Sequence, residues 1–348
     1  MDIIGITLGD VYGIGPEVVI KAINLLQGNT DIPVCDSINL LQSKHQPSPS
    51  QWERILIIGD AAAFKHFCAP WLDGRDILSI DSPSSARFEP GILNILDLKN
   101  INLDNITQGK VCSEAGRASV EYIKTAVSLA LSGKISKVVT APISKEAIHK
   151  AGFSYPGHTQ LLAELTSATE YAMMFYSGKL KVILATIHVA LRDVPEIITT
   201  EMVLKTIRIA DKSLRYNFGI GSPIIAVAGL NPHAGENGAF GKEDMEIIKP
   251  AIDLAVKEGI KASGPYPPDT VFLQAIEGKC DIVVAMYHDQ GLIPLKLLAF
   301  DSAVNVTVGL PIIRTSPDHG TAFDIAGKGI ANPQSMVEAI RLAARLGC

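Results

Sequence analysis

Short apolar runs alternate with longer amphipathic stretches along most of this chain. Each apolar run is nearly continuous and is soon followed by Gly, Pro or His, as in parallel strands that are buried on both faces. We predict strands at Ile3–Leu8, Ile55–Ile58, Lys137–Thr140, Lys181–Ile187, Ile224–Ala228, Asp281–Met286 and Ala303–Thr307. Helical periodicity between them predicts helices at Pro16–Leu26, Gly116–Ser132, His158–Leu165, Thr200–Phe218, Lys242–Glu258 and Ser335–Leu346. This alternation indicates an α/β fold with mostly parallel sheets.

Composition and charge narrow the class of protein. The chain has 348 residues, of which 47% are hydrophobic and 19% charged, as expected of a globular protein with room for two domains. The net charge is −5 and no long basic run is present, so nucleic-acid binding is not indicated. No apolar run reaches the length of about 18 residues that a membrane span needs. Five scattered cysteines without a CxxC motif favour a reducing compartment, which predicts a cytoplasmic protein.

Histidines gather at the predicted strand ends. His188, His233 and His288 each follow a strand directly or through a short loop, and His319 lies beyond the apolar segment that ends at Ile313. Ligands of open parallel sheets bind beyond the carboxyl ends of the strands. Three imidazoles with an open fourth position suit a catalytic zinc ion or a similar metal. A single histidine at a strand end is more often a hydrogen-bonded loop residue, so spacing alone leaves both interpretations open.

Two further segments bear on ligand binding. Gly9–Glu17 is a glycine-rich turn between strand and helix, but it has neither the GxGxxG fingerprint nor the P-loop pattern, so a Rossmann cofactor site is not supported. Gly157–Thr159 opens a predicted helix, whose first N–H groups favour a phosphate. Arg314 and Lys296 are candidate cations of an anion pocket, whereas Lys145 is better interpreted as a solvated charge.

Longer motifs rich in Gly, Pro and His run from one end of the chain to the other. They are Gly13-Ile14-Gly15-Pro16-Glu17, Thr140-Ala141-Pro142-Ile143-Ser144-Lys145, Gly157-His158-Thr159, His188 with Leu191-Arg192-Asp193-Val194, Gly229-Leu230-Asn231-Pro232-His233-Ala234-Gly235-Glu236, Pro268-Asp269-Thr270, Tyr287-His288-Asp289-Gln290-Gly291, Asn305-Val306-Thr307 and Arg314-Thr315-Ser316-Pro317-Asp318-His319-Gly320-Thr321-Ala322. These motifs resemble those of the 4-hydroxythreonine-4-phosphate dehydrogenase family of pyridoxal phosphate biosynthesis. The resemblance covers nearly all of the chain except the segment Gly28–Trp52.

The resemblance implies a role for each matching residue. The divalent-metal ligands of the family match three residues here, His188, His233 and His288. Its substrate-binding positions match His158, Thr159, Lys296, Asn305 and Arg314. Acidic residues near its active site match Asp269 and Asp289, and the candidate proton acceptors are these two carboxylates and Lys296. The implied cofactors are NAD or NADP, bound without a Rossmann fingerprint, and a divalent metal, with zinc, magnesium and cobalt as candidates.

The same resemblance implies an isocitrate/isopropylmalate dehydrogenase-like fold with two α/β/α domains. The active-site cleft is expected between the domains, at the interface of a homodimer. We predict that residues 1–140 and 302–348 form the first domain, with a surface insertion at 28–52. Residues 141–301 are predicted to form the second domain, which binds the metal and makes the dimer.

The implied reaction is the oxidation of 4-phosphohydroxy-L-threonine at C3. The product, 2-amino-3-oxo-4-phosphooxybutanoate, loses CO₂ to give 3-amino-2-oxopropyl phosphate. Three alternatives are the same oxidation of threonate or erythronate 4-phosphate, a metal-dependent phosphohydrolase, and a binding protein without catalysis. The family usually has Gly-Asp-Pro-Ala-Gly at the first turn, where this chain has Val11 and Tyr12, a change expected to affect only the lip of the cleft.

Overall fold

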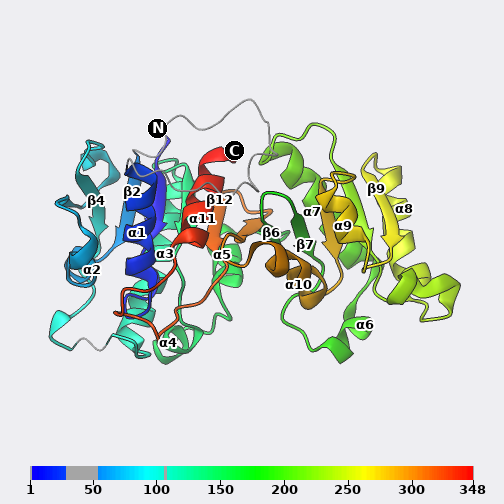
Figure 1. Cartoon of the computed structure of the whole chain (residues 1–348), viewed down its shortest axis with the longest axis horizontal. Coiled ribbons are helices and arrows are strands. Elements are labelled where there is room, and N and C mark those ends of the chain that lie inside the picture. Colours follow the sequence, from blue (N-terminus) through cyan, green and yellow to red (C-terminus); the bar gives the residue numbers. More distant parts are fainter. Residues whose placement is uncertain (1, 29–53, 106–107, 348) are drawn as a thin grey trace. The chain divides into compact units, whose positions relative to one another are not determined.

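A computed structural model describes residues 2–28, 54–105 and 108–347 of the chain. The predicted insertion at 28–52 therefore lies, apart from its first residue, outside the described residues. The described residues divide into two compact units (Figure 1). The first unit contains the described residues up to Ala168 together with Leu310–Arg345. The second unit contains Thr169–Gly309 and the described end of the chain from Leu346.

The first unit is built on a parallel sheet with the strand order β3-β4-β2-β1-β5-β12. Its strands are β1 (Ile4–Thr7), β2 (Ile55–Gly59), β3 (Asp76–Ile80), β4 (Ile92–Asp97), β5 (Lys137–Thr140) and β12 (Ile313–Pro317). Its α-helices are α1 (Gly15–Gln27), α2 (Ala61–Cys68), α3 (Ser113–Leu131), α4 (Lys145–Lys150), α5 (His158–Thr166) and α11 (Gln334–Arg345). Helix α1 packs against α2 and α11, and α3 packs against α4 and α5.

The second unit has a mixed sheet with the strand order β11-β6-β7-β10-β8-β9. Strand β6 runs antiparallel to β11 and β7, and the pairs from β7 to β9 are parallel. The strands are β6 (Ala172–Tyr176), β7 (Lys181–Leu184), β8 (Ile224–Ala228), β9 (Lys261–Tyr266), β10 (Ile282–Ala285) and β11 (Val304–Val308). The α-helices are α6 (Val194–Ile197), α7 (Thr200–Tyr216), α8 (Lys249–Lys257), α9 (Val271–Ile276) and α10 (His288–Ala299).

Apolar side chains of the strands form the cores of both units. Strands β1, β2, β5, β7 and β10 are buried along their whole length, as the continuous apolar runs in the sequence predict. In the second unit, Val182, Leu184 and Val283 from the sheet pack with Phe272 of α9 and Leu295 of α10. Burial of these side chains fixes the strands whose ends carry the predicted ligands, at about 1.5–3 kcal/mol per large side chain.

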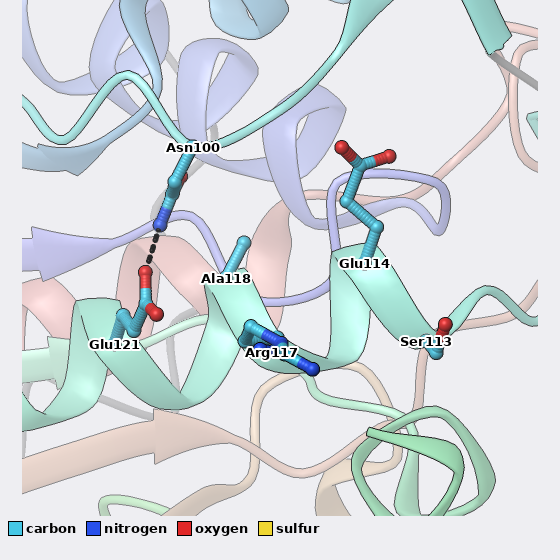
Figure 2. Close-up of a pocket in the computed structure, with 6 residues that line it drawn as sticks. All are labelled: Asn100, Ser113, Glu114, Arg117, Ala118 and Glu121. Carbon is cyan, nitrogen blue, oxygen red and sulfur yellow. Dashed lines mark hydrogen bonds between the residues drawn. The ribbon is translucent and has the colours of Figure 1, made fainter.

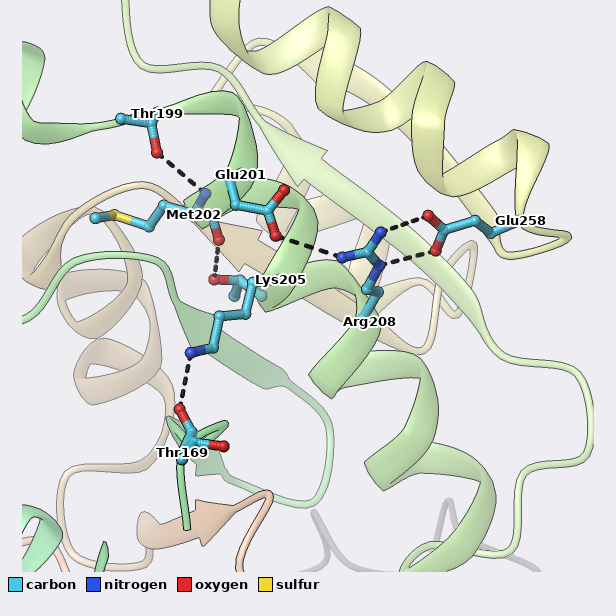
Figure 3. Close-up of polar contacts among 8 residues, drawn as sticks. Thr169, Thr199, Glu201, Met202, Lys205, Arg208 and Glu258 are labelled. Carbon is cyan, nitrogen blue, oxygen red and sulfur yellow. Dashed lines mark hydrogen bonds and ion pairs between the residues drawn. The ribbon is translucent and has the colours of Figure 1, made fainter.

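Helix α7 is held at its start and along one side by polar contacts (Figure 3). The Thr199 hydroxyl accepts a hydrogen bond from the Met202 N–H, which caps the helix. Arg208 donates two hydrogen bonds to Glu258, the residue after α8, and one to Glu201. These ion pairs are exposed, and such pairs add little stability, so the buried apolar face of α7 contributes most to its packing.

The predicted α/β fold with mostly parallel sheets is confirmed, but some details were wrong. Every predicted strand is present, whereas β3, β4, β6, β9 and β12 were missed. Strands β3 and β9 are partly exposed, and β12, Ile313–Pro317, has a polar centre, so none of these three has the continuous apolar run that marks a buried strand. The helix predicted over Lys242–Glu258 is present as one continuous helical run, but its first part, Asp244–Ile248, is π-helical and α8 follows without a break. Pro250, which has no N–H to donate, lies just after the π-helical segment.

The observed units differ from the predicted domain boundaries. The first unit does not end at Thr140 but continues through α4 and α5 to Ala168, and it resumes at Leu310 instead of at residue 302. The reason is close packing of α3 against α4. A Cβ on Gly116 would lie 2.3 Å from the Ala147 carbonyl carbon, so the two backbones touch directly. Within the described residues, no helix is both long and apolar enough to span a bilayer.

Candidate functional site

Three predicted ligands lie at one edge of the sheet in the second unit. Strands β7, β10 and β8 are neighbours and parallel, so their carboxyl ends meet at the same edge. His188 follows the end of β7, His288 follows β10 and opens α10, and His233 follows β8 in the next loop. We call these three residues the histidine edge. All three side chains are partly or fully exposed, so solvent ions can reach them.

Two rings of the histidine edge lie close together. The ring centroids of His188 and His288 are 5.9 Å apart, with 39° between the ring planes. Two imidazoles on one tetrahedral zinc ion, with Zn–N distances of about 2.0–2.1 Å, have centroids roughly 5 Å apart. The observed centroid separation is therefore about 1 Å larger than that of two ligands of one ion. Asp289 Oδ1 lies 2.6 Å from His288 Nδ1, which leaves Nε2 of that ring for a ligand.

His233 is held differently from the other two. It begins a run of residues with positive φ, from His233 (φ 54°) to Asn237 (φ 53°), inside the segment Pro232–Gly238. Its ring packs 6.0 Å from that of Phe240. Across the described ranges, no three His, Cys, Asp or Glu side chains are grouped closely enough to hold a metal ion. The structure thus brings two predicted ligands together and places the third on the same edge.

The other predicted site residues of the second unit come from several elements. Asp289 and Lys296 share α10 with His288, and Lys296 Nζ lies 6.0 Å from the centroid of the Phe300 ring. Asp269 is exposed in the turn between β9 and α9, and Asn305 is partly buried in β11. Helix α10 therefore carries a predicted metal ligand, a predicted substrate ligand and a predicted acid on one element.

In the first unit, Arg314 is a buried cation held by a hydroxyl. Its side chain is only 2% exposed, and its Nε and Nη2 atoms donate hydrogen bonds to Thr140 Oγ1 at 3.1 and 2.6 Å. Strands β12 and β5 are paired, which brings the two residues together from distant parts of the sequence. Burial lowers the pKa of Arg314 to about 9, so the guanidinium is still charged at neutral pH.

His158 and Thr159 begin helix α5 near this cation. Burial and the neighbouring Arg314 charge lower the pKa of His158 well below its ordinary value, although a hydrogen bond with the Ala141 backbone opposes the shift. Nε2 of His158 is buried and has no hydrogen-bond partner in the described part of the chain. The Thr159 side chain is also buried. We call Thr140, His158, Thr159 and Arg314 the anion region, because it combines a buried charge with polar atoms at a helix start.

The turn Gly9–Glu17 and His319 both belong to the first unit. Gly9 has φ 65°, and a Cβ there would lie 2.2 Å from the Pro142 carbonyl oxygen, so the segment Gly9–Glu17 is the tight turn that its glycines predict. His319 does not belong to the histidine edge, because it follows β12 in the first unit. The four strand-end histidines are therefore divided three to one between the two units.

A separate pocket in the first unit contains none of the predicted site residues (Figure 2). Its lining comes from the start of α3 and the loop before it, and includes Asn100, Ser113, Glu114, Arg117, Ala118 and Glu121. Asn100 Nδ2 donates to Glu121 Oε2 at 2.6 Å, and Tyr122 donates its hydroxyl hydrogen to Asn100 Oδ1. Acidic and basic side chains both line this pocket, so its lining does not by itself favour an anion or a cation.

The sequence of this chain matches a known protein family. The family model described as "Pyridoxal phosphate biosynthetic protein PdxA" matches residues 51–343. The chain belongs to this family. Its match covers both units, including the whole histidine edge and anion region. The suspected membership of the 4-hydroxythreonine-4-phosphate dehydrogenase family is thereby confirmed.

Relatives that match nearly the whole chain have two related names. The chain is 46% identical to D-threonate 4-phosphate dehydrogenase of Salmonella typhimurium over 99% of this chain and 98% of the relative. It is 42% identical to 4-hydroxythreonine-4-phosphate dehydrogenase of Desulforapulum autotrophicum over 98% and 94%. A crystal structure of 4-hydroxythreonine-4-phosphate dehydrogenase from Klebsiella pneumoniae gives a TM-score of 0.85 and 43% identity, covering 99% of this chain and 97% of that chain.

These matches confirm that the chain is a dehydrogenase, and the family implies a nicotinamide cofactor. Two polar residues of the site region were not singled out from the sequence. Thr140 holds Arg314, and Gln290 links the ends of β8 and β10 through hydrogen bonds to Gly229 and Met286. Both lie inside motifs that the sequence made visible, but their partners are distant in sequence, so no local signal revealed their roles.

Proposed function

We propose that the chain uses NAD or NADP and a divalent metal to oxidise a small hydroxy acid phosphorylated at C4. The observation that carries the proposal is the histidine edge, in which neighbouring parallel strands bring His188 and His288 to a ring separation of 5.9 Å. A dehydrogenase of this family would use such an edge to bind a metal beside the substrate hydroxyl. The nicotinamide cofactor is proposed because the chain belongs to this family, since the sequence has no Rossmann fingerprint.

The substrate we propose first is 4-phosphohydroxy-L-threonine, as named in relatives of this chain. Its oxidation at C3 gives 2-amino-3-oxo-4-phosphooxybutanoate, and loss of CO₂ then gives 3-amino-2-oxopropyl phosphate, in the route to pyridoxal phosphate. A second candidate is D-threonate 4-phosphate, because other relatives of similar identity are named for that substrate. The two differ at C2, where an amine is replaced by a hydroxyl group.

His188, His233 and His288 would hold the metal, for which zinc, cobalt and magnesium are candidates. When bound, a divalent cation lowers the pKa of a hydroxyl group beside it. Asp289 is proposed to orient the His288 ring, because its carboxylate lies 2.6 Å from Nδ1. The proton of the C3 hydroxyl is proposed to pass to one of the remaining candidates, Asp269 or Lys296, as hydride leaves C3 for the nicotinamide.

The anionic ends of the substrate need cations and hydrogen-bond donors. Arg314 supplies a buried positive charge, and Thr140 holds its guanidinium in position. His158 offers Nε2, a buried atom with no hydrogen-bond partner among the described residues. Thr159 adds a hydroxyl at the start of α5, where helix N–H groups favour a phosphate. Lys296 and Asn305 complete the proposed set. Holding both ends of the substrate positions C3 for hydride transfer.

We also propose that the chain acts as a homodimer. Helix α10 exposes Ile293, Leu297 and Phe300 on one face, with Leu297 83% exposed. Exposed apolar stripes of this kind mark interaction surfaces. Because the same helix carries His288 and Lys296, a second copy that covers this face would shield the site from water. Sedimentation of the chain and of Leu297→Glu should give a dimer and a monomer, respectively.

Cytoplasmic localisation stays a prediction from the scattered cysteines.

The test is absorbance at 340 nm with purified protein, either nicotinamide cofactor, a divalent metal and 4-phosphohydroxy-L-threonine. A rise that a chelator abolishes supports the proposal. A rise with D-threonate 4-phosphate alone would keep the chemistry and replace the substrate. Activity that is unchanged after chelation and metal removal would contradict the role of the histidine edge.

A further inference from the structure

Gln290 joins two of the strand ends that carry the proposed ligands. Its Oε1 atom accepts a hydrogen bond of 2.6 Å from the Met286 N–H, just past β10. Its Nε2 atom donates one of 2.7 Å to the Gly229 carbonyl, just past β8. The side chain is buried at 7% exposure, so both bonds are shielded from water. One amide thus fixes the distance between the starts of the two loops.

Thr186 ties the third strand end to the same place. Its N–H and its hydroxyl both donate to the Met286 carbonyl, at 3.1 and 2.7 Å. The peptide groups on either side of Met286 are therefore held by Gln290 on one side and by Thr186 on the other. Thr186 is buried like Gln290. The ends of β7, β10 and β8 are connected through these two side chains.

Asp244 holds the loop after β8 in its left-handed path. Its carboxylate accepts hydrogen bonds from the Leu230 N–H at 2.8 Å and the Asn231 N–H at 3.1 Å, and a third from Asn231 Nδ2 at 3.0 Å. The side chain is fully buried. A Cβ on Gly235, inside the loop, would lie 3.2 Å from Asp244, so the loop folds closely around this carboxylate.

The buried hydrogen bonds lie at the same distance along the chain from each of the three histidines. Each of the three tied backbone positions, at Thr186, Asn231 and Met286, lies two residues before a histidine of the histidine edge. The ligands themselves are exposed, whereas the backbone beneath them is fastened by buried polar side chains. We propose that Gln290, together with Thr186 and Asp244, positions the three histidines before the metal arrives. This inference rests on the proposed metal site and names positioning residues for it.

The chain offers a matched control for Gln290. Asn94 in β4 of the first unit is also a buried amide with one accepted and one donated backbone bond, both to Arg87, at 2.7 and 2.8 Å. Gln290→Met and Asn94→Leu each remove one accepted and one donated hydrogen bond between a side-chain amide and the backbone, with little change of side-chain volume. A purely structural role for Gln290 predicts similar losses of Tm and no difference in metal affinity between the two variants.

The experiment measures the Kd of Zn²⁺ by competition with a coloured chelator, for the wild-type chain, Gln290→Met and Asn94→Leu. The visible spectrum of bound Co²⁺ reports ligand geometry in the same samples, and thermal unfolding reports the fold. We expect Gln290→Met to raise the Kd about 10- to 100-fold, as loss of a partner behind the ligands typically does. Asn94→Leu should leave the Kd within about twofold of the wild type.

Each outcome bears on a different statement. A Kd within about twofold of the wild type for Gln290→Met, or equal weakening by both variants, would overturn the positioning role. A wild-type chain that binds no Zn²⁺ would instead overturn the proposed metal site on which this inference rests. If Gln290→Met does not fold, Thr186→Val decides by the same criterion. Its control is Thr315→Val, which removes a buried hydroxyl bond of the same kind to the Ala339 carbonyl.

Discussion

The anion region and the histidine edge hold their polar groups in opposite ways. In the anion region the side chains of Thr140, Thr159 and Arg314 are buried, as is the Nε2 atom of His158. Arg314 is held by Thr140. At the histidine edge the functional rings are exposed, and only the backbone beneath them is fastened. A buried arginine can bind a phosphate through its own charge, whereas the histidine edge would bind an anionic substrate through the metal ion proposed for it.

The two regions also differ in how far burial affects their polar side chains. Burial disfavours the charged forms in the anion region, which lowers the pKa of Arg314 and of His158. The rings of the histidine edge, by contrast, are partly or fully exposed. We therefore expect the two regions to respond differently to substitution: the histidine edge through the loss of an ion, and the anion region through substrate affinity and through pH.

The largest expected effect is at the histidine edge. His288→Ala should remove the bound metal and lower kcat by at least about 10³-fold, because metal activation of the hydroxyl and one ligand are lost together. Metal content by atomic emission and steady-state kinetics measure the two effects. His66→Ala, an exposed histidine on α2, is the control and should change neither. Full activity of a metal-free His288→Ala chain would contradict the assignment.

A smaller effect is expected in the anion region. Arg314→Met keeps the length of the side chain but removes the charge, and it should raise KM for the phosphorylated substrate about 100-fold. The metal content should stay normal, which separates this variant from the histidine variants. Arg208→Met, which removes an exposed ion-paired cation on α7, serves as the matched control. An unchanged KM for Arg314→Met would show that the phosphate binds elsewhere.

The smallest effect concerns stability and pH. Because the folded-state pKa of His158 lies well below its unfolded value of about 6.5, the unfolded chain binds more protons below that pH. His158 should therefore reduce the free energy of unfolding as pH falls below about 6.5, by up to about 1.4 kcal/mol per pH unit. His158→Gln should unfold with a shallower pH dependence in urea titrations between pH 7.5 and 5. Equal slopes for this variant and the wild type would refute a neutral, buried His158.

The two regions also differ in how far the sequence foretells them. Apolar runs ending before His188, His233 and His288 predict three strand ends with ligands. The strand order that makes these ends neighbours is set by packing across the whole sheet, and no local pattern reveals it. Strand β6 was missed for a related reason, since its antiparallel pairing depends on β11, which lies far along the chain.

The anion region depends even more on distant contacts. The sequence marks Arg314 and the helix start at His158, but the bond between Arg314 and Thr140 joins residues 174 positions apart. The burial that shifts both pKa values arises only after the strands pair. Gln290 is a similar case, because its motif is visible in the sequence while its partner Gly229 is 61 positions away. Residue identity is therefore predictable here, and mutual placement is not.

The strand order of the second unit has a consequence for how the chain is made. Synthesis delivers β7 first, β8 next and β10 last, yet β10 lies between the other two in the sheet. A nascent chain that has not yet released β10 from the ribosome holds His188 and His233 on strands that lack their common neighbour. Insertion of β10 then joins β7 to β8 and delivers His288 together with the Gln290 link. A chain cut short before Ile282 would carry both earlier histidines but would lack His288 and the Gln290 link between the strand ends.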